Sequence, residues 1–292
     1  MTRQGIVLEG GGMRGMFTCG ITDVLMEHDI WFDALVGVSA GILFGCNYKS
    51  GQIGRGLRYN LRFKDDKRYM SWQSLWKTGD YVNAEFAYHT LPETLDPFDK
   101  DAFRNNPMEF YVTCTDIIAG KPVYQRIDEI AGDAMEWFRA TASMPIFARP
   151  VQIGSLTLLD GGLSDSIPLQ FLQNKGCEKN LVVLTQPMGY RKKKSKATPL
   201  IKLFTRKYPQ VTELMKTRHE AYNKQLDYIE QQVAQGNTFV LAPRQGLGIG
   251  RIEQNEKKMR MVYEHGRQTA LQNIGPLKEF LNQKYTDSPY TL

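Results

Sequence analysis

The residues best suited to chemistry in this sequence surround one serine. Residues 37–41 read Gly-Val-Ser-Ala-Gly, and they follow a largely apolar run over residues 30–36. A strand, a sharp Gly-x-Ser-x-Gly turn and a helix make a nucleophile elbow, which holds a serine hydroxyl out at the end of a strand. Gly37 and Gly41 suit such a turn, because a side chain at either position would clash with nearby backbone. Ser39 is therefore the candidate nucleophile.

Two further glycine-rich motifs follow apolar strand candidates. Residues 10–15 read Gly-Gly-Gly-Met-Arg-Gly and come shortly after the apolar run 5–8. Residues 160–162 read Asp-Gly-Gly and directly follow the apolar run 156–159. An Asp-Gly-Gly motif by itself indicates a turn, so its meaning depends on the other two motifs.

These three motifs, in this order, resemble those of the patatin-like phospholipase family. The resemblance covers roughly the first 190 residues and includes residues 142–147, Ala-Ser-Met-Pro-Ile-Phe, which are similar to the family's Ala-Ser-x-x-Pro segment. Pro168 stands where the family has a proline after its Asp-Gly-Gly motif. One departure is Ser166, where the family often has asparagine, and it concerns a supporting hydrogen bond rather than the catalytic pair.

The resemblance implies a dyad of Ser39 and Asp160 that hydrolyses lipid acyl esters. Ser39 would attack the acyl carbonyl, Asp160 would pass the hydroxyl proton to the leaving alcohol, and water would then release the fatty acid. Since an aspartate has an ordinary pKa of about 3.9, burial must raise that pKa for it to act as a base. The expected protein is a serine acyl hydrolase of the phospholipase A, lysophospholipase or esterase type, with no metal and no cofactor.

The oxyanion hole is expected in the N-terminal glycine-rich loop. Backbone N–H groups of Gly11, Gly12, Met13 and Arg14 would face the ester oxygen, because glycines let amides approach it closely. The arginine side chain would add positive charge or fasten the loop. The helix that starts near Ala40 would point its positive end at the same place.

The four histidines lack a motif that would make one of them the base. His28 lies at a predicted helix end before the elbow strand, and His89, His219 and His265 lie in helical or irregular segments. Histidine is the usual partner of a serine nucleophile. Each of these four is nevertheless expected to be a structural or surface residue.

Strand and helix signals alternate along the chain and predict an α/β fold. The expected architecture is the three-layer patatin-like fold, a mostly parallel central sheet with helices on both faces. Residues 1–190 would form the catalytic domain, and residues 191–292 a helical C-terminal extension packed on the same domain. Strands are expected at 6–8, 34–36, 109–115, 121–125, 156–159, 181–184 and 238–242, and helices at 16–28, 40–49, 128–143, 211–233, 256–273 and 276–284.

The segment 51–101 is less regular and rich in aromatic residues. It fits either a cap whose side chains contact an acyl chain or a satellite core under a long connection. Its aromatic residues include Trp72, Trp76, Tyr81, Phe86 and Tyr88.

The net charge of +6 is concentrated in one short run. Five of these charges lie within residues 191–196, so the chain has a local basic patch rather than a face for nucleic acid. The patch is either a solvated loop or a peripheral contact with anionic lipid headgroups. Its basic residues are Arg191, Lys192, Lys193, Lys194 and Lys196.

The remaining composition predicts a cytoplasmic protein that can associate with a membrane peripherally. No run of 18 uncharged apolar residues is present, and the N-terminus does not read as a signal peptide. The four cysteines lack metal-binding spacing and are expected to be reduced and mostly buried.

Two other classes of function compete with hydrolysis. The same fold could transfer the acyl group to another alcohol, or sense lipids without turnover. Alternatively, Gly10, Gly12 and Gly15 fit the Gly-x-Gly-x-x-Gly fingerprint of a nucleotide-binding module. Asp29 and Asp33 are poorly placed for the ribose contact of that fingerprint, which disfavours nucleotide binding.

Overall fold

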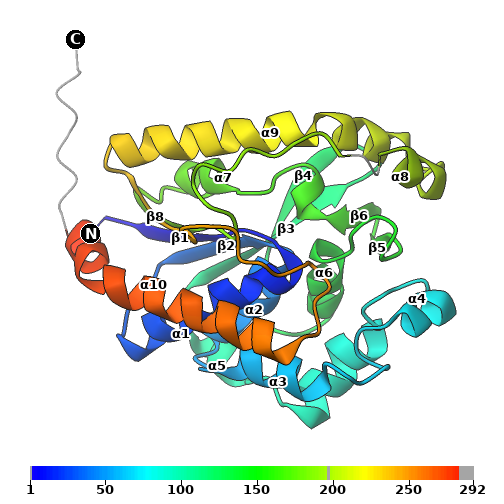
Figure 1. Ribbon diagram of the computed structural model, residues 1–292, viewed down its shortest axis with the longest axis horizontal. Coiled ribbons are helices and arrows are strands. Elements are labelled where there is room, and N and C mark those ends of the chain that lie inside the picture. The colour runs from blue at the N-terminus through cyan, green and yellow to red at the C-terminus, as the bar shows by residue number, and fades with distance from the viewer. Residues whose placement is uncertain (1, 196–197, 283–292) are drawn as a thin grey trace.

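The computed structural model describes residues 2–195 and 198–282, except for the side chains of residues 198, 199 and 204. Lys196, one of the five basic residues of the patch, lies outside this part of the chain. The described residues form one sheet of eight strands between two layers of helices (Figure 1).

Parallel strands make up the centre of the sheet, in the order β3-β2-β1-β7-β8. Antiparallel strands β4, β5 and β6 extend the sheet beyond β3. The prediction of an α/β fold with a mostly parallel sheet is therefore confirmed. The strands are β1 (Gln4–Leu8), β2 (Ala34–Val38), β3 (Glu109–Asp116), β4 (Lys121–Arg126), β5 (Val151–Ile153), β6 (Leu156–Asp160), β7 (Lys179–Val183) and β8 (Thr238–Leu241).

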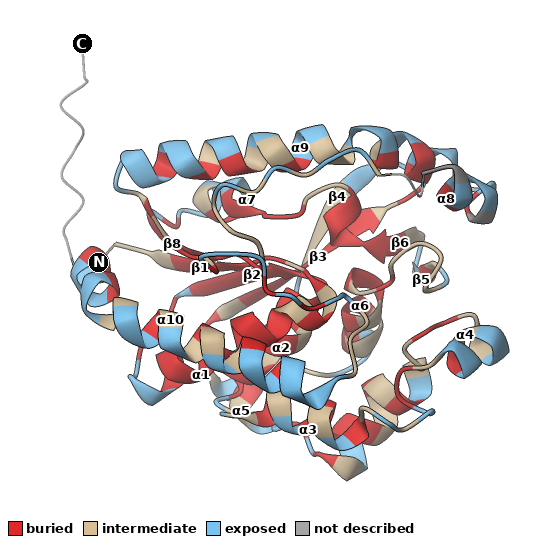
Figure 2. Cartoon of the chain, in the orientation of Figure 1, coloured by how far each residue is buried: buried red, intermediate tan, exposed pale blue. Residues whose placement is uncertain are grey.

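Alternating side chains along the central strands divide the core between the two faces of the sheet. On β1, Ile6 and Leu8 belong to the largest apolar cluster, whereas Val7 between them belongs to the second cluster. Successive side chains of a strand point to opposite faces, so each cluster covers one face. Figure 2 shows the resulting band of buried residues along the sheet and the inner sides of the helices.

The helices that cover the two faces come from both ends of the chain. One face is covered by α1 (Met16–Glu27), α2 (Ala40–Lys49) and α10 (Glu256–Asn282), and the other by α7 (Leu169–Asn174) and α9 (Pro209–Ala234) (Figure 1). The other helices are η1 (Gly12–Gly15), α3 (Arg55–Phe63), α4 (Trp72–Thr78), η2 (Phe86–Leu95), α5 (Lys100–Asn105), α6 (Ala134–Thr141), η3 (Gly161–Leu163) and α8 (Thr198–Phe204).

Two glycines let α1 and α10 cross closely. A Cβ atom on Gly20 would lie 2.0 Å from the carbonyl oxygen of Tyr263, and one on Gly266 would lie 2.1 Å from that of Phe17. Neither position accepts a side chain unless the helices separate. The helix at the end of the described chain is thus seated directly on the first long helix.

Three predicted helices have clearly different bounds in the structure. The helix predicted over 128–143 begins later, as α6 (Ala134–Thr141). The pair predicted over 256–273 and 276–284 is the single helix α10, which runs through Pro276, and its predicted end at Lys284 lies outside the described residues.

Packing explains why α10 continues past its proline. A proline inside a helix removes one backbone hydrogen bond and crowds the preceding turn. Leu277, Phe280 and Leu281 all become buried after Pro276, and this apolar burial offsets the loss. On α9, helical spacing along the sequence predicts Val233 on the buried face with Val211 and Leu226, whereas the structure leaves Val233 41% exposed.

Candidate active site

Strand register brings Ser39 and Asp160 together. Val38, the last residue of β2, pairs with Thr113 of β3, and Asp160, the last residue of β6, pairs with the adjacent Cys114. Since β4 occupies the opposite edge of β3 along the same stretch, β2 and β6 must share one edge. Strand β2 runs parallel to β3, whereas β6 runs antiparallel to it. The C-terminal ends of β2 and β6 therefore approach each other head to head.

Ser39 occupies a strained turn between β2 and α2. Its backbone angles, φ 54° and ψ −124°, lie in a region that residues with side chains rarely adopt. The turn has no space for side chains at its glycines, because a Cβ on Gly41 would lie 2.3 Å from the carbonyl oxygen of Leu8. Ser39 is 8% exposed, and α2 begins immediately after it.

A buried threonine that has no motif of its own fixes this turn. The Thr141 Oγ1 accepts a hydrogen bond from the Ser39 N–H at 2.9 Å and donates one to the carbonyl of Thr113 at 2.5 Å. Two residues later, the Ser143 carbonyl accepts a hydrogen bond from the Asp160 N–H at 2.9 Å. The end of α6 therefore positions both candidate residues. In the sequence, the only pointer to Thr141 is the Ala-Ser segment that begins at the next residue.

Asp160 is buried in surroundings that act on its charge in opposite directions. Burial raises the pKa of its carboxyl, while a hydrogen bond from the Gly162 N–H at 2.7 Å favours the ionised form. The positive charge of Arg218, a side-chain hydrogen bond from Ser39 and the charge of Arg251 also lower the pKa, in decreasing order. Burial prevails, so the pKa lies above that of an ordinary aspartate.

The loop after Asp160 is held by hydrogen bonds to its backbone. The Thr115 Oγ1 donates to the Asp160 carbonyl at 2.9 Å, and the Ser166 Oγ donates to the Gly162 carbonyl at 3.0 Å. Ser166, where the family often has asparagine, thus still supplies a supporting hydrogen bond. Arg218 donates from Nε to the same Gly162 carbonyl.

The N-terminal glycine-rich loop lies directly against the serine. A Cβ on Gly10 would lie 2.9 Å from the Val38 carbonyl oxygen and 3.0 Å from the Ser39 Cβ. Gly12 has a φ of 58°, and a Cβ there would lie 2.4 Å from the carbonyl oxygen of Arg251. A side chain at either glycine would displace the loop from the serine.

The four amides predicted for the oxyanion hole differ in their hydrogen bonding. The Met13 N–H donates to the Arg251 carbonyl at 3.0 Å, and the Arg14 N–H donates to the Gly11 carbonyl at 3.3 Å. Within the described part of the chain, the N–H groups of Gly11 and Gly12 have no acceptor. These two amides are therefore free for a ligand, whereas the other two are engaged.

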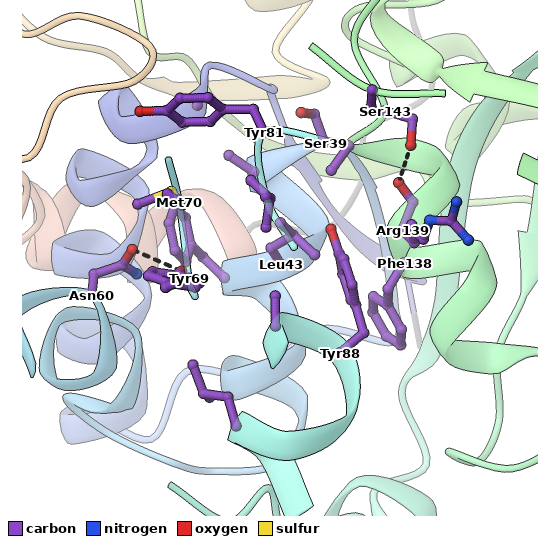
Figure 3. Close-up of a pocket in the computed structure, with 18 of the residues that line it drawn as sticks. Ser39, Leu43, Asn60, Tyr69, Met70, Tyr81, Tyr88, Phe138, Arg139 and Ser143 are labelled. Atoms are coloured by element: carbon purple, nitrogen blue, oxygen red, sulfur yellow. Dashed lines mark hydrogen bonds between the residues drawn. The ribbon is translucent and has the colours of Figure 1, made fainter. Parts of the chain in front are cut away.

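An apolar cavity of about 160 Å³ opens beside Ser39. Leu43 of α2 and Phe138 of α6 line it together with aromatic residues of the segment 51–101 (Figure 3). Figure 3 shows the Tyr88 ring between Leu43 and Phe138, on the wall of this space. The cavity offers apolar contacts to a hydrocarbon chain that starts at the serine.

The segment 51–101 serves as core and as cavity wall. Tyr81, Phe86 and Tyr88 are buried within the largest apolar cluster, and Tyr81 and Tyr88 also line the apolar cavity. The two tryptophans on α4 face outward instead, with Trp72 61% exposed and Trp76 85% exposed. These aromatic residues therefore belong to the main core rather than to a separate satellite core, and a cap that contacts an acyl chain stays a prediction.

A second cavity, of about 320 Å³, meets the first at Ser39 and is the more polar of the two. Its lining includes Asp160, Arg14 and Arg218. It also includes His219, which the sequence predicts to be a structural or surface residue. The His219 Nδ1 is buried without a hydrogen-bond partner among the described residues. This histidine has no hydrogen bond to Ser39 or Asp160 in the described part of the chain.

The basic run separates into residues with different environments. Arg191 pairs with Asp227 at 3.0 Å and with Glu230 at 3.2 Å. Lys192 and Lys193 line the second cavity. Lys194 is exposed and lines neither of the two cavities at Ser39.

The described residues contain no metal-binding cluster, no disulfide and no helix suited to span a membrane. In that part of the chain no group of three or more histidine, cysteine, aspartate or glutamate residues is arranged to hold a metal ion. All four cysteines are free, and burial raises the pKa of each thiol. None of the described helices combines the length and the apolar character needed to cross a bilayer.

Fold and site together define an α/β protein with a serine at a strand–helix turn beside an apolar cavity. Residues 6–172 match the sequence model of the patatin-like phospholipases, and this is more than half of the chain, so the protein belongs to that family. Residues 208–282 match a domain of unknown function, DUF6363. Membership of this family favours the elbow interpretation of the glycine motifs over a nucleotide-binding fingerprint.

Individual relatives are distant. The uncharacterized protein YjjU of Escherichia coli strain K12 is 25% identical over 63% of this chain and 52% of its own length. Lysophospholipase NTE1 of Cryptococcus neoformans is 27% identical over 61% of this chain and 11% of its own length. The uncharacterized NTE family protein MT2641 of Mycobacterium tuberculosis is 27% identical over 56% of this chain and 27% of its own length. The chain thus spans about half or less of these curated relatives.

Among solved structures, the crystal structure of VipD from Legionella pneumophila aligns with this chain at a TM-score of 0.48 and 9% sequence identity. The alignment covers 94% of this chain and 67% of that chain.

Proposed function

We propose that the protein is a serine acyl hydrolase that cleaves acyl esters of lipids, with Ser39 as nucleophile and Asp160 as base. The observation that carries this proposal is the head-to-head approach of β2 and β6 along one edge of β3. This register brings a strained serine to a buried carboxylate at the junction of two cavities. Family membership supports the same chemistry.

The proposed reaction begins with attack of the Ser39 Oγ on the acyl carbonyl carbon. Asp160 takes the hydroxyl proton, and its raised pKa makes it a better proton acceptor than an ordinary carboxylate. It then gives the proton to the leaving alcohol oxygen as the carbon–oxygen ester bond breaks. Water, activated by the same carboxylate, hydrolyses the acyl-serine and releases the fatty acid.

The negative oxygen that develops during attack needs preorganised donors. We assign this role to the Gly11 and Gly12 amides, which have no acceptor among the described residues. The N-terminus of α2, directly after Ser39, adds a favourable dipole. One such donor contributes about 2.7–4 kcal/mol of transition-state stabilisation in comparable sites.

A lipid substrate follows from the walls of the apolar cavity. Leu43, Tyr88 and Phe138 provide a surface on which a hydrocarbon chain would be removed from water. The Cryptococcus relative that matches residues of this chain carries the name lysophospholipase, which supports the same substrate class. The acyl ester would lie at Ser39, where this cavity ends.

The test measures hydrolysis of nitrophenyl esters and labelling by a fluorophosphonate probe. Ser39→Ala is expected to abolish both, and Asp160→Asn to reduce kcat by at least about 100-fold, the usual scale for loss of a general base. Ser155→Ala, at an exposed turn, is the matched serine control and keeps both signals. Full hydrolysis by the Ser39 variant would exclude the proposal.

His219 provides the discriminating control for the identity of the base. It lines the second cavity but has no hydrogen bond to the serine among the described residues. His219→Gln is expected to reduce kcat by less than about tenfold, far below the loss expected for a base. The opposite ranking of His219 and Asp160 variants would assign the base to the histidine.

A further inference from the structure

We propose that α9 fixes the position of the N-terminal glycine-rich loop relative to the loop after Asp160, and that Tyr222 and Arg218 on this helix are positioning residues for the reaction. This inference rests on the proposed function and adds residues to it. Helix α9 contains neither the nucleophile nor the base, and it lies entirely within the DUF6363 match over residues 208–282. The inference therefore assigns a role at the site to a domain of unknown function.

Two polar residues interrupt the apolar face of α9. Met215 and Leu226 of this face are buried, and helical spacing places Arg218 and Tyr222 between them. Tyr222 is 1% exposed, and Arg218 is half-buried. Polar groups in such positions need hydrogen-bond partners, because burial without partners is costly. Both residues find their partners at the two loops beside Ser39.

Tyr222 holds the start of the glycine-rich loop through Glu9, the buried residue between β1 and Gly10. The Glu9 Oε1 accepts a hydrogen bond from the Tyr222 hydroxyl at 2.7 Å, and its Oε2 accepts one from the Thr185 N–H at 2.6 Å. A buried carboxylate is costly unless donors of this kind satisfy it. Burial, followed by the charge of Glu9, raises the pKa of Tyr222, so the phenol keeps its proton and remains the donor.

The C-terminal part of the chain also holds the other end of the glycine-rich loop. The Met13 N–H donates to the Arg251 carbonyl at 3.0 Å. The amides of Gly11 and Gly12, proposed as oxyanion donors, thus lie between two contacts, at Glu9 and at Met13. Each of these contacts involves a residue after position 190.

The same face of α9 also holds the loop after Asp160. Arg218 donates from Nε to the Gly162 carbonyl, and Gln225 donates from Nε2 to the carboxylate of Asp165. The Gly162 N–H in turn donates to the Asp160 carboxylate at 2.7 Å. Arg218 therefore fixes the peptide unit next to the one that contacts the proposed base.

One face of a single helix thus contacts both loops. Arg218 and Tyr222 are four residues apart, so their side chains are neighbours on the helix surface. In the described part of the chain no backbone hydrogen bond joins the two loops directly. One loop would supply the oxyanion donors and the other the base, so their separation must match the ester at Ser39. A displacement of about 1 Å can cost about 100-fold in rate.

The first test removes one hydroxyl of α9. Tyr222→Phe deletes the hydrogen bond to Glu9 and keeps the ring. We expect kcat for a nitrophenyl ester to fall at least about tenfold and KM to change less than about twofold, because the donors would shift while the apolar cavity stays intact. Tyr228→Phe is the matched control, since its hydroxyl donates to Gln173 of α7 at 2.5 Å and to neither loop, and it should keep the wild-type kcat. Equal kcat values in the two variants overturn the inference.

A second test separates this inference from the proposed function. Deuterium uptake is measured for peptides that cover residues 9–15 and 160–168. We expect Tyr222→Phe to speed uptake in the first peptide and Arg218→Gln in the second, whereas Tyr228→Phe changes neither. Unchanged uptake in both loop variants overturns the inference. Faster uptake in a protein that hydrolyses no ester would support the contacts of α9 and contradict the proposed function alone.

Discussion

A buried carboxylate must be ionised to act as a base, the role proposed for Asp160, and the residues around Asp160 adjust its ionisation. Burial favours its neutral form, while the Gly162 N–H and the charge of Arg218 favour its charged form. A group whose pKa is raised in this way loses its charge at a higher pH than an ordinary aspartate. The pH dependence of the reaction should therefore report this residue directly.

We expect kcat/KM for a neutral ester to fall as pH decreases through the pKa of Asp160, with a midpoint above the ordinary value of about 3.9. Arg218→Gln removes a charge that lowers this pKa, so the midpoint should move to higher pH, and Arg218→Lys should move it less. A pH–rate profile on each protein, with folding checked by circular dichroism, measures the shift. A midpoint that stays at the ordinary value would contradict the role of burial.

At the level of the elements, α6 aligns the ends of two strands through Thr141. This side chain is fully buried and bonds to the Ser39 N–H on one side and the Thr113 carbonyl on the other. Its removal would leave a buried N–H at a strained turn without an acceptor. We therefore propose Thr141 as a positioning residue, which would act on the proposed reaction through the serine.

Thr141→Val keeps the shape of the side chain and removes both hydrogen bonds. We expect it to lower the free energy of unfolding by about 1–3 kcal/mol, the cost of an unsatisfied buried polar group. It should also lower kcat more than it raises KM, because the serine would lose its alignment. Thr141→Ser retains the hydroxyl and should restore kcat. A loss of kcat in Thr141→Ser as large as that in Thr141→Val would contradict the positioning role, because the serine variant keeps the hydroxyl.

The local part of this architecture could be predicted from sequence, and the long-range part could not. Glycine spacing around Ser39 identifies the elbow because a tight turn excludes side chains within a few residues. The engagement of the Met13 amide by the Arg251 carbonyl has no local signal, since the two residues meet only in the folded chain. The same reason hides the entry of His219 into the second cavity.

For the whole molecule, the crossing of α1 and α10 joins the two ends of the described chain. Gly266→Ala places a methyl group against the backbone of Phe17, so we expect a loss of about 1–3 kcal/mol in the free energy of unfolding, the usual cost of overpacking. Gly275→Ala lies in the same helix with no atom within 4 Å of its added Cβ and should be neutral or stabilising by up to about 1 kcal/mol. Urea unfolding of the two variants distinguishes a close crossing from a general effect of helix propensity.

The crossing of α1 and α10 also concerns the predicted division into a catalytic domain, residues 1–190, and a C-terminal extension, residues 191–292. We propose that residues 191–292 form one cooperative unit with the N-terminal part, because β8 extends the central sheet and α10 packs on α1. A single urea transition for wild type, followed both by far-ultraviolet circular dichroism and by tryptophan fluorescence, would agree with this. Separate transitions would indicate two units.

Contact with a membrane is a property of the whole surface, and the structure leaves few of the basic residues for it. Arg191 is paired with two carboxylates, and Lys192 is half-buried at the cavity, so the run offers less free charge than its sequence suggests. Exposed Trp72 and Trp76 on α4 supply an apolar alternative, because tryptophan favours the interface between water and lipid.

We therefore expect binding to vesicles to depend more on the tryptophans than on the lysines. Trp76→Ala should weaken sedimentation with vesicles that contain anionic lipid. The remaining binding should fall at high salt, because salt screens the attraction between basic residues and headgroups, which is about 1 kcal/mol per basic residue. Lys194→Gln, which removes one exposed charge, should have the smaller effect. If the lysine variant loses binding and the tryptophan variant does not, membrane contact is electrostatic and lies at the basic run.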